Sequence, residues 1–254
     1  MRMPQRVWLA IALFLLATPA LPSDDLSDRV ADQFRQTLAK ADRALADGDH
    51  HLAMALLEGA LYTTGVRVAI DAHSLDPRGT DQEEAVRQAF STWSESLDGD
   101  FPIQLVGDSE NYDVVIRFVD SIPDAGAHGL GLIKVTKNYR WSSQKHEVKY
   151  SGSIQVVRAA PGGRLSPAET LDVVMHELGH LLGLADVARI GDLMGPLVRG
   201  KPVLRPTEPE VNAVKDLRKT IRRRIKLVQA NLPPSGTSGE YTERIMHLAL
   251  AAQN

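Results

Sequence analysis

The 254-residue chain contains no cysteine. Disulfide bonds therefore cannot stabilise the fold, and no cysteine is available for lipidation near the N-terminus. The formal net charge is only -3, so the charge balance gives no reason to expect nucleic acid or another polyanion as a partner. Long apolar runs are also scarce. The run over residues 7–17 is too short to span a bilayer as a settled helix, and no later run is longer, so we expect no stable membrane span.

The first residues, 1–23, have the pattern of a secretory signal peptide. Arg2 and Arg6 precede the apolar run, small residues follow it, and acidic residues come next. This order is typical of export and predicts a secreted or periplasmic location. An uncleaved N-terminal anchor is the alternative, because residues 18–23 do not form a clean A-x-A cleavage site.

Hydrophobic residues make up 43% of the chain, which is enough for a packed core. Residues 24–64 carry two helical apolar patterns separated by Gly48 and Asp49, which predicts an α-helical hairpin. The spacing of its small residues resembles half of a tetratricopeptide-type unit, but solenoids need several stacked repeats and only one is found. We interpret the hairpin as a packing element or propiece, with an interaction element as the alternative.

The segment 65–231 reads as one domain in which strands and helices are interleaved. A helix is expected over 80–97, a second is opened by a Ser-Pro cap at 166–167, and a third by a capping box at 207–210. Five short strands, rich in β-branched residues, are expected over 66–72, 103–107, 113–119, 129–136 and 151–159. The predicted class is α+β with α/β-type layers. Residues 232–254 read as a linker followed by a loosely attached C-terminal helix.

The stretch HELGHLLGLADVARIGDLMGP, residues 176–196, carries the chemistry. His176 and His180 are four residues apart on one expected helix, so both imidazoles project from the same face and can bind one zinc ion. Glu177 lies beside the first histidine, where its carboxylate can act as general base toward a zinc-activated water without binding the metal. These two histidines alone are a weak signal, since residues of an ordinary helix can share the spacing.

The residues that follow strengthen the pattern. Gly183 can end the helix in a left-handed turn and bring Asp186 back toward the same ion. Met194, followed by Gly195 and Pro196, supplies a methionine turn. Together these features predict one catalytic zinc site, with Met194 and Pro196 beside it or packed beneath it.

Because of these motif residues, the segment from residue 66 to about residue 227 resembles a metzincin metallopeptidase, and most closely the matrixin branch of that family. The resemblance implies a zincin domain with a five-stranded mixed sheet, an active-site helix, a Met-turn and a C-terminal helix. It also implies that strand 129–136 is the sheet edge with which an extended peptide substrate pairs. Gly129 and Gly131 would let another backbone approach that edge closely.

Asp186 departs from the matrixin pattern, which has histidine there, and is similar to the snapalysin branch, which has aspartate. Two histidines and a carboxylate form an acceptable zinc-ligand set, so Asp186 is assigned as the third ligand. The alternative is that Asp186 only ends the helix and that Asp192 or solvent completes the site.

Other departures concern the structural zinc of matrixins and their propeptide. Leu132 stands where a structural-zinc histidine is expected, and His128 and His146 alone do not make a second four-ligand site, so no structural zinc is predicted. The matrixin switch cysteine is absent, and the hairpin could mask the site only sterically. His50 and His51, in the hairpin turn, are expected at the surface.

The leading hypothesis is an exported, single-zinc endopeptidase that hydrolyses an extended peptide or protein. A catalytically silent metzincin scaffold that serves protein interaction is the alternative. The presence of Glu177 favours the enzyme.

Overall fold

The computed structural model describes residues 26–76, 80–107, 111–123 and 129–250. The expected signal peptide, residues 1–23, lies outside these ranges. The helices are α1 (Asp32–Ala46), α2 (His50–Leu61), η1 (Ala72–Ser74, a 3-10 turn), α3 (Thr80–Ser96), α4 (Pro167–Leu181) and α5 (Glu208–Ala230). The strands are β1 (Val66–Ile70), β2 (Ile103–Val106), β3 (Val114–Val119), β4 (Gly129–Trp141), β5 (His146–Val157), β6 (Ala159–Ala160), β7 (Gly163–Arg164) and β8 (Gly239–Leu250). The predicted α+β class is confirmed.

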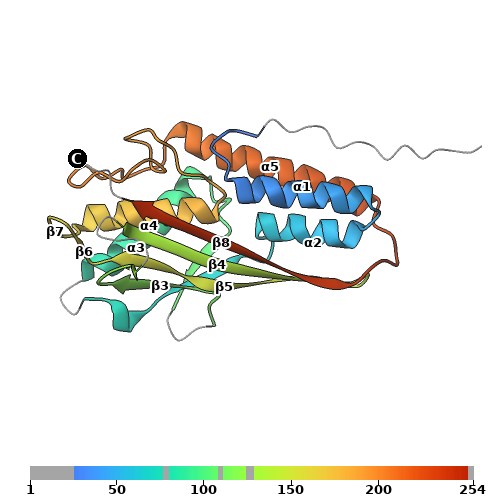
Figure 1. Ribbon diagram of the computed structural model, residues 1–254, viewed down its shortest axis with the longest axis horizontal. Coiled ribbons are helices and arrows are strands. Elements are labelled where there is room, and N and C mark those ends of the chain that lie inside the picture. The colour runs from blue at the N-terminus through green and yellow to red at the C-terminus, as the bar shows by residue number, and fades with distance from the viewer. Residues whose placement is uncertain (1–25, 77–79, 108–110, 124–128, 251–254) are drawn as a thin grey trace, which may run out of the picture.

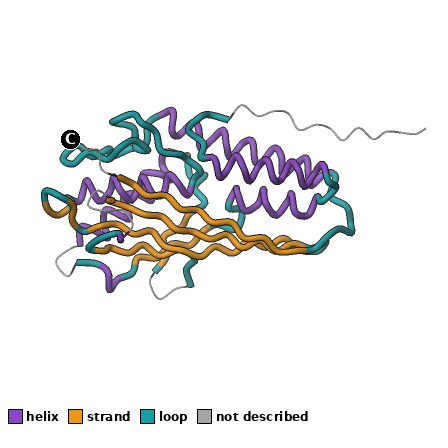
Figure 2. Tube along the Cα trace, viewed as in Figure 1, coloured by secondary structure: helices purple, strands orange, loops and turns teal. Residues whose placement is uncertain are grey.

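The main sheet has six strands in the order β2-β1-β3-β5-β4-β8. The pairs β2-β1, β1-β3 and β3-β5 are parallel, whereas β4 is antiparallel to both β5 and β8. Figure 1 shows β4, β5 and β8 running along the length of the molecule, with α4 at one end and the hairpin helices at the other. In Figure 2 the long strands form one layer, with α1 and α2 over one end of it and α5 running along the molecule toward that end.

The C-terminal segment corrects two predictions. Residues 240–250 were expected in a helix, but they form β8, which pairs with β4 from Gly129↔Leu250 to Trp141↔Gly239. The sheet therefore has a sixth strand, and β4 is not its free edge. Ile245 and Ala249 are each 1% exposed, whereas Met246 is 65% exposed and the two residues after it are partly buried. This short apolar pattern fits a helix or a strand, and the unpaired backbone of β4 decides for the strand.

The hairpin formed by α1 and α2 shares one continuous core with the rest of the chain. Phe34 and Leu38 of α1 are 2% and 3% exposed, and Phe34 lies against Gly183, just after the motif helix. The α1 helix is joined to α5 by an ion pair of 2.8 Å between Asp42 and Arg224. The hairpin therefore packs on the domain rather than standing apart from it.

The helix α4 begins where the sequence predicts. Ser166 accepts a hydrogen bond from the Glu169 amide, and the Glu169 carboxylate accepts one from the Ser166 amide, so the expected capping box is present. Beneath α4, the buried Trp93 of α3 donates its Nε1–H to the Met175 carbonyl over 3.0 Å. The middle of α4 is thereby held firmly against α3. Within the described residues, none of the helices has the length and apolar composition needed to cross a lipid bilayer.

Candidate metal centre

Three of the predicted site residues converge at the C-terminal end of α4. The Nε2 atoms of His176 and His180 are 3.2 Å apart. One carboxylate oxygen of Asp186 lies 3.1 Å from the first of these atoms and 3.4 Å from the second. Both imidazoles are buried, whereas 55% of the Asp186 side chain is exposed. The cluster is therefore closed on the helix side and open toward Asp186.

Backbone carbonyls fix how the two imidazoles are protonated. The Nδ1 atom of His176 lies 2.8 Å from the Leu193 carbonyl oxygen, and that of His180 lies 3.0 Å from the Leu184 carbonyl oxygen. A carbonyl can only accept, so each neutral ring carries its hydrogen on Nδ1 and presents the Nε2 lone pair to the cluster. Two lone pairs and a carboxylate that face one another form a group suited to hold a cation between them.

The spacing of these three atoms fits zinc. Ligands held at about 2.0–2.1 Å from a tetrahedral zinc ion lie about 3.3–3.4 Å from one another, close to the 3.1, 3.2 and 3.4 Å found here. The pKa shifts of Asp186 and His180 agree with this, because they favour a carboxylate and a neutral imidazole, whereas that of His176 favours a protonated ring in the metal-free chain. Burial acts to raise the pKa of Asp186, but its contacts with the two histidines outweigh burial and lower it. Burial lowers the pKa of His180, whereas contact with Asp186 overcomes burial and raises that of His176.

The loop after α4 brings Asp186 to the two histidines. Gly183 has a φ of 101°, the left-handed conformation expected at the helix end. The next residues pair with the segment before α1, since Ala185 donates its amide to the Arg29 carbonyl and Leu184 forms a bridge with Val30. The N-terminal segment therefore takes part in positioning Asp186, a role that the sequence did not reveal.

Asp192, the alternative third ligand, points elsewhere. Its carboxylate forms an ion pair of 2.9 Å with Arg29 and lies 3.7 Å from Arg189. The geometry therefore favours Asp186 over Asp192 as the residue that completes the cluster.

Glu177 lies beside the cluster and is completely buried. Burial raises the pKa of this carboxyl to about 8, and the neighbouring His176 and the amide of Ala249 oppose only part of the rise. The β4 backbone comes very close, because a Cβ atom added at Gly131 would lie 2.3 Å from a Glu177 carboxylate oxygen. Gly131 was expected to let another backbone approach, but the group that lies against it here is the Glu177 carboxylate of the same chain.

Met194 packs beneath α4. A Cβ atom added at Gly179 would lie 2.4 Å from the Met194 sulfur, so only glycine leaves room for this contact. The Met194 amide donates to the buried Glu210 carboxylate over 2.8 Å. The sequence identified Glu210 only as a helix cap, because its bond to the Met-turn links segments that are not adjacent in the chain.

The sequence comparison agrees with this geometry. The matrixin family model matches residues 63–218, more than half of the chain. The chain belongs to the matrixin family. No curated protein sequence matches it.

Membership in the matrixins indicates a zinc metallopeptidase that acts on peptides or proteins, and the cluster of His176, His180 and Asp186 is a group able to bind such an ion. The recognition made from the motif and the Met-turn is confirmed at the level of the family and the fold. The match does not bear on whether Asp186 is a metal ligand.

The other histidines are placed differently from expectation. His51 is only 1% exposed, so its prediction as a surface residue is wrong. Its ring contacts His146, with 3.1 Å between Nδ1 and Nε2, and its Nε2 atom lies 3.2 Å from the Pro233 carbonyl. Both contacts come from segments distant in sequence, which explains why the hairpin alone suggested exposure. His128 lies outside the described residues.

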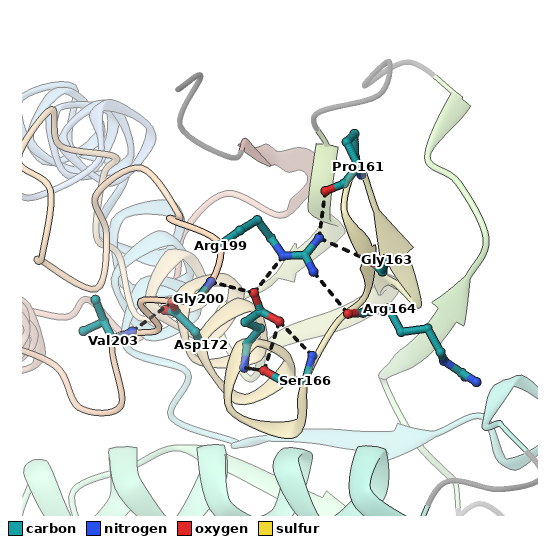
Figure 3. Close-up of polar contacts among 9 residues, drawn as sticks. Pro161, Gly163, Arg164, Ser166, Asp172, Arg199, Gly200 and Val203 are labelled. Carbon is teal, nitrogen blue, oxygen red and sulfur yellow. Dashed lines mark hydrogen bonds and ion pairs between the residues drawn. The ribbon is translucent and has the colours of Figure 1, made fainter.

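A second polar network holds the segment that follows the Met-turn of this matrixin (Figure 3). The Glu169 carboxylate accepts bonds from Arg199 and from the Gly200 amide, over 2.7 and 2.9 Å. Although burial opposes it, these donors and Ser166 lower the pKa of Glu169 to about 2. The Asp172 carboxylate accepts from the Val203 amide over 3.0 Å. Residues 199–203 are therefore tied to α4, by contacts that join segments some 30 residues apart and that the sequence does not signal.

Proposed function

We propose that the chain is an exported zinc endopeptidase in which His176, His180 and Asp186 hold one catalytic zinc ion and Glu177 is the general base. The observation that carries the proposal is the convergence of two Nε2 atoms and one carboxylate oxygen within 3.4 Å. Residues 1–23, with their signal-like order of charges and apolar residues, support export.

The chain itself prepares the site. The carbonyls of Leu193 and Leu184 keep the hydrogens of the two imidazoles on Nδ1, so the Nε2 lone pairs remain directed at the ion. When bound, zinc would supply a Lewis acid that polarises a peptide carbonyl and acidifies a water molecule. Asp186 adds a negative charge that three histidines would not, so this water would be less acidic than in a three-histidine site.

Glu177 moves the protons. Its carboxylate would take a proton from the attacking water and pass that proton to the leaving amine of the cleaved peptide bond. Burial raises the pKa of Glu177 in the metal-free chain; a zinc ion and water beside the carboxylate would lower that pKa and leave the group ionised, as a general base must be. The proposed substrate is an extended peptide or protein segment, as for other metallopeptidases of this family.

Metal content tests the ligand set. We expect one equivalent of zinc in the purified parent and a sharp fall in the Asp186→Ala variant. Asp192→Ala is the matched control, since this carboxylate is paired with Arg29 instead. Zinc retained in Asp186→Ala and lost in Asp192→Ala would contradict the assignment.

Peptide cleavage tests the chemistry. Glu177→Gln should bind zinc like the parent but lose turnover of an unfolded protein or a peptide library, by about 100-fold or more. If that variant cleaves like the parent, Glu177 is not the base. If the zinc-loaded parent cleaves nothing, a silent scaffold that serves protein interaction becomes the better description.

A further inference from the structure

The end of β8 occupies the edge of β4, the strand with which a peptide substrate is expected to pair. It runs antiparallel along β4, with Gly131 opposite Ala249, and on its other side the Leu197 amide donates to the Leu250 carbonyl over 3.4 Å. Leu197 follows the Met-turn directly. The last residues of β8 are therefore held by backbone bonds both to β4 and to the segment beyond the metal cluster, a mode of binding that does not depend on side-chain identity.

This segment covers the reactive groups. The His247 ring stacks on the His180 ring, with centroids 4.1 Å apart and an interplanar angle of 10°. Ala249 is 1% exposed and its amide faces the carboxylate of Glu177. Both oxygens of Glu177 are buried and form no hydrogen bond within the described part of the chain. With β8 in place, a carboxylate that must meet water and substrate has no solvent exposure.

Side-chain hydrogen bonds attach the first half of β8 to α1 and β4, whereas apolar side chains of the last half are exposed. Glu243 accepts hydrogen bonds from Thr37 over 2.6 Å and from Tyr139 over 3.0 Å, and Tyr241 contacts Lys40 of α1. By contrast, 65% of Met246 and 49% of Leu250 are exposed. Residues 246–250 could therefore leave β4 while residues 239–245 stay attached.

We propose that residues 246–250 are an intramolecular inhibitor that occupies the β4 edge in place of a peptide substrate, with residues 239–245 as its tether. This inference rests on the proposed peptidase function. A tethered segment competes at an effective concentration in the millimolar range, so it would exclude substrates that bind only weakly. Cleavage then requires that the segment be released from β4.

The absence of cysteine allows a direct test in the full chain. The inner lock, Lys134→Cys with Met246→Cys, joins two exposed residues that are direct partners in the β4–β8 register. Directly opposed residues of an antiparallel pair have Cα atoms about 4.5–5.5 Å apart, within the range that a disulfide spans. The outer lock, Arg140→Cys with Glu240→Cys, is the matched control at the tethered end, six residues along the same register.

Oxidising the inner lock should lower kcat/KM for a fluorogenic peptide by at least about tenfold, and a reductant should restore it. The outer lock should be equally active oxidised and reduced, and the parent is treated with the same reagents. The inference is overturned if the oxidised inner lock cleaves as fast as its reduced form while cleavage still depends on Glu177. In that outcome the peptidase function stands and only the inhibitor is refuted.

A variant that weakens pairing tests the opposite direction. Ala249→Pro removes the backbone N–H that faces Glu177 and puts a proline ring in its place, which the buried end of β8 has no room for, so the segment should leave β4 and kcat/KM should rise by at least about tenfold. Met246→Ala, at an exposed position, should have little effect. If zinc-loaded Ala249→Pro and the reduced inner lock cleave no peptide at all, the peptidase function fails and the inhibitor fails with it.

Hydrogen exchange gives a measure that is independent of turnover. Amides of residues 246–250 should exchange faster than those of 239–245, and oxidising the inner lock should slow them. Equal protection along all of β8 would show that the strand does not open at its end, and would overturn the proposal.

Discussion

Glu210 should be the residue of α5 on which the metal centre depends most. One of its carboxylate oxygens accepts from the Met194 amide over 2.8 Å, and the other accepts from both the amide and the hydroxyl of Thr207, each over 2.7 Å. The side chain is fully buried. It therefore satisfies the Met-turn backbone and the start of α5 at once.

The cost of Glu210→Ala follows from these contacts. The Met194 amide would be left buried without a partner, which costs about 1–3 kcal/mol, and loss of the capping box costs about 1 kcal/mol more. A total of about 3 kcal/mol corresponds to a fall in Tm of about 6–12 °C for a chain of this size. Because Leu193, beside Met194, orients His176, zinc affinity should also fall by about 10- to 100-fold.

Glu208→Ala is the matched control, since Glu208 is an exposed glutamate in the same first turn. It should cost only about 0.3–1 kcal/mol through the helix dipole. Thermal unfolding by circular dichroism and competition with a zinc chelator measure the two effects. If the Glu210 variant is no less stable and binds zinc no more weakly than the Glu208 variant, the proposed link between α5 and the Met-turn is refuted.

Three further changes test the site and the core. Gly131→Ala should displace the Glu177 carboxylate, because the added Cβ would lie 2.3 Å from it; peptide turnover should fall while zinc content is retained, and unchanged turnover would contradict the reasoning. Burial raises the pKa of Asp172 to about 7, so this carboxyl contributes stability to the metal-free fold at pH values below the ordinary aspartate pKa, and the contribution is lost as the pH rises through about 7. In urea unfolding with a chelator present, the free energy of unfolding of Asp172→Asn should therefore fall less over this pH range than that of the parent. Identical pH profiles of the parent and the variant would refute this assignment. Phe34→Ala should destabilise the whole chain by about 3–5 kcal/mol in a single transition, as we propose for a hairpin that is integral to the core, whereas separate unfolding of the hairpin would favour a removable propiece.

The site on α4 could be predicted because its information is local. The positions of His176, Glu177 and His180 follow from helix periodicity once Ser166 and Gly183 mark the two ends. The strands of the main domain could also be predicted, because short runs of β-branched residues between turn residues usually form strands.

Choices between chemically similar residues depended on distant partners. Asp186 and Asp192 were both candidates for the third position, and the second is removed from the cluster by its ion pair with Arg29. His51 was assigned to the surface because nothing near it in the sequence suggests the contacts with His146 and Pro233 that bury it. A single sequence gives the side chains that can pair, but not which of them meet.

The amino-acid sequence alone determined the helix that carries the metal motif, the turn that follows it and the class of chemistry, because each depends on residues within about one or two helical turns of one another. Only the tertiary structure decided that residues 239–250 form a strand on β4 and cover Glu177. The physical reason is that strand pairing satisfies backbone groups of two segments about 100 residues or more apart, and a short apolar pattern fits helix and strand equally until the partner edge is present.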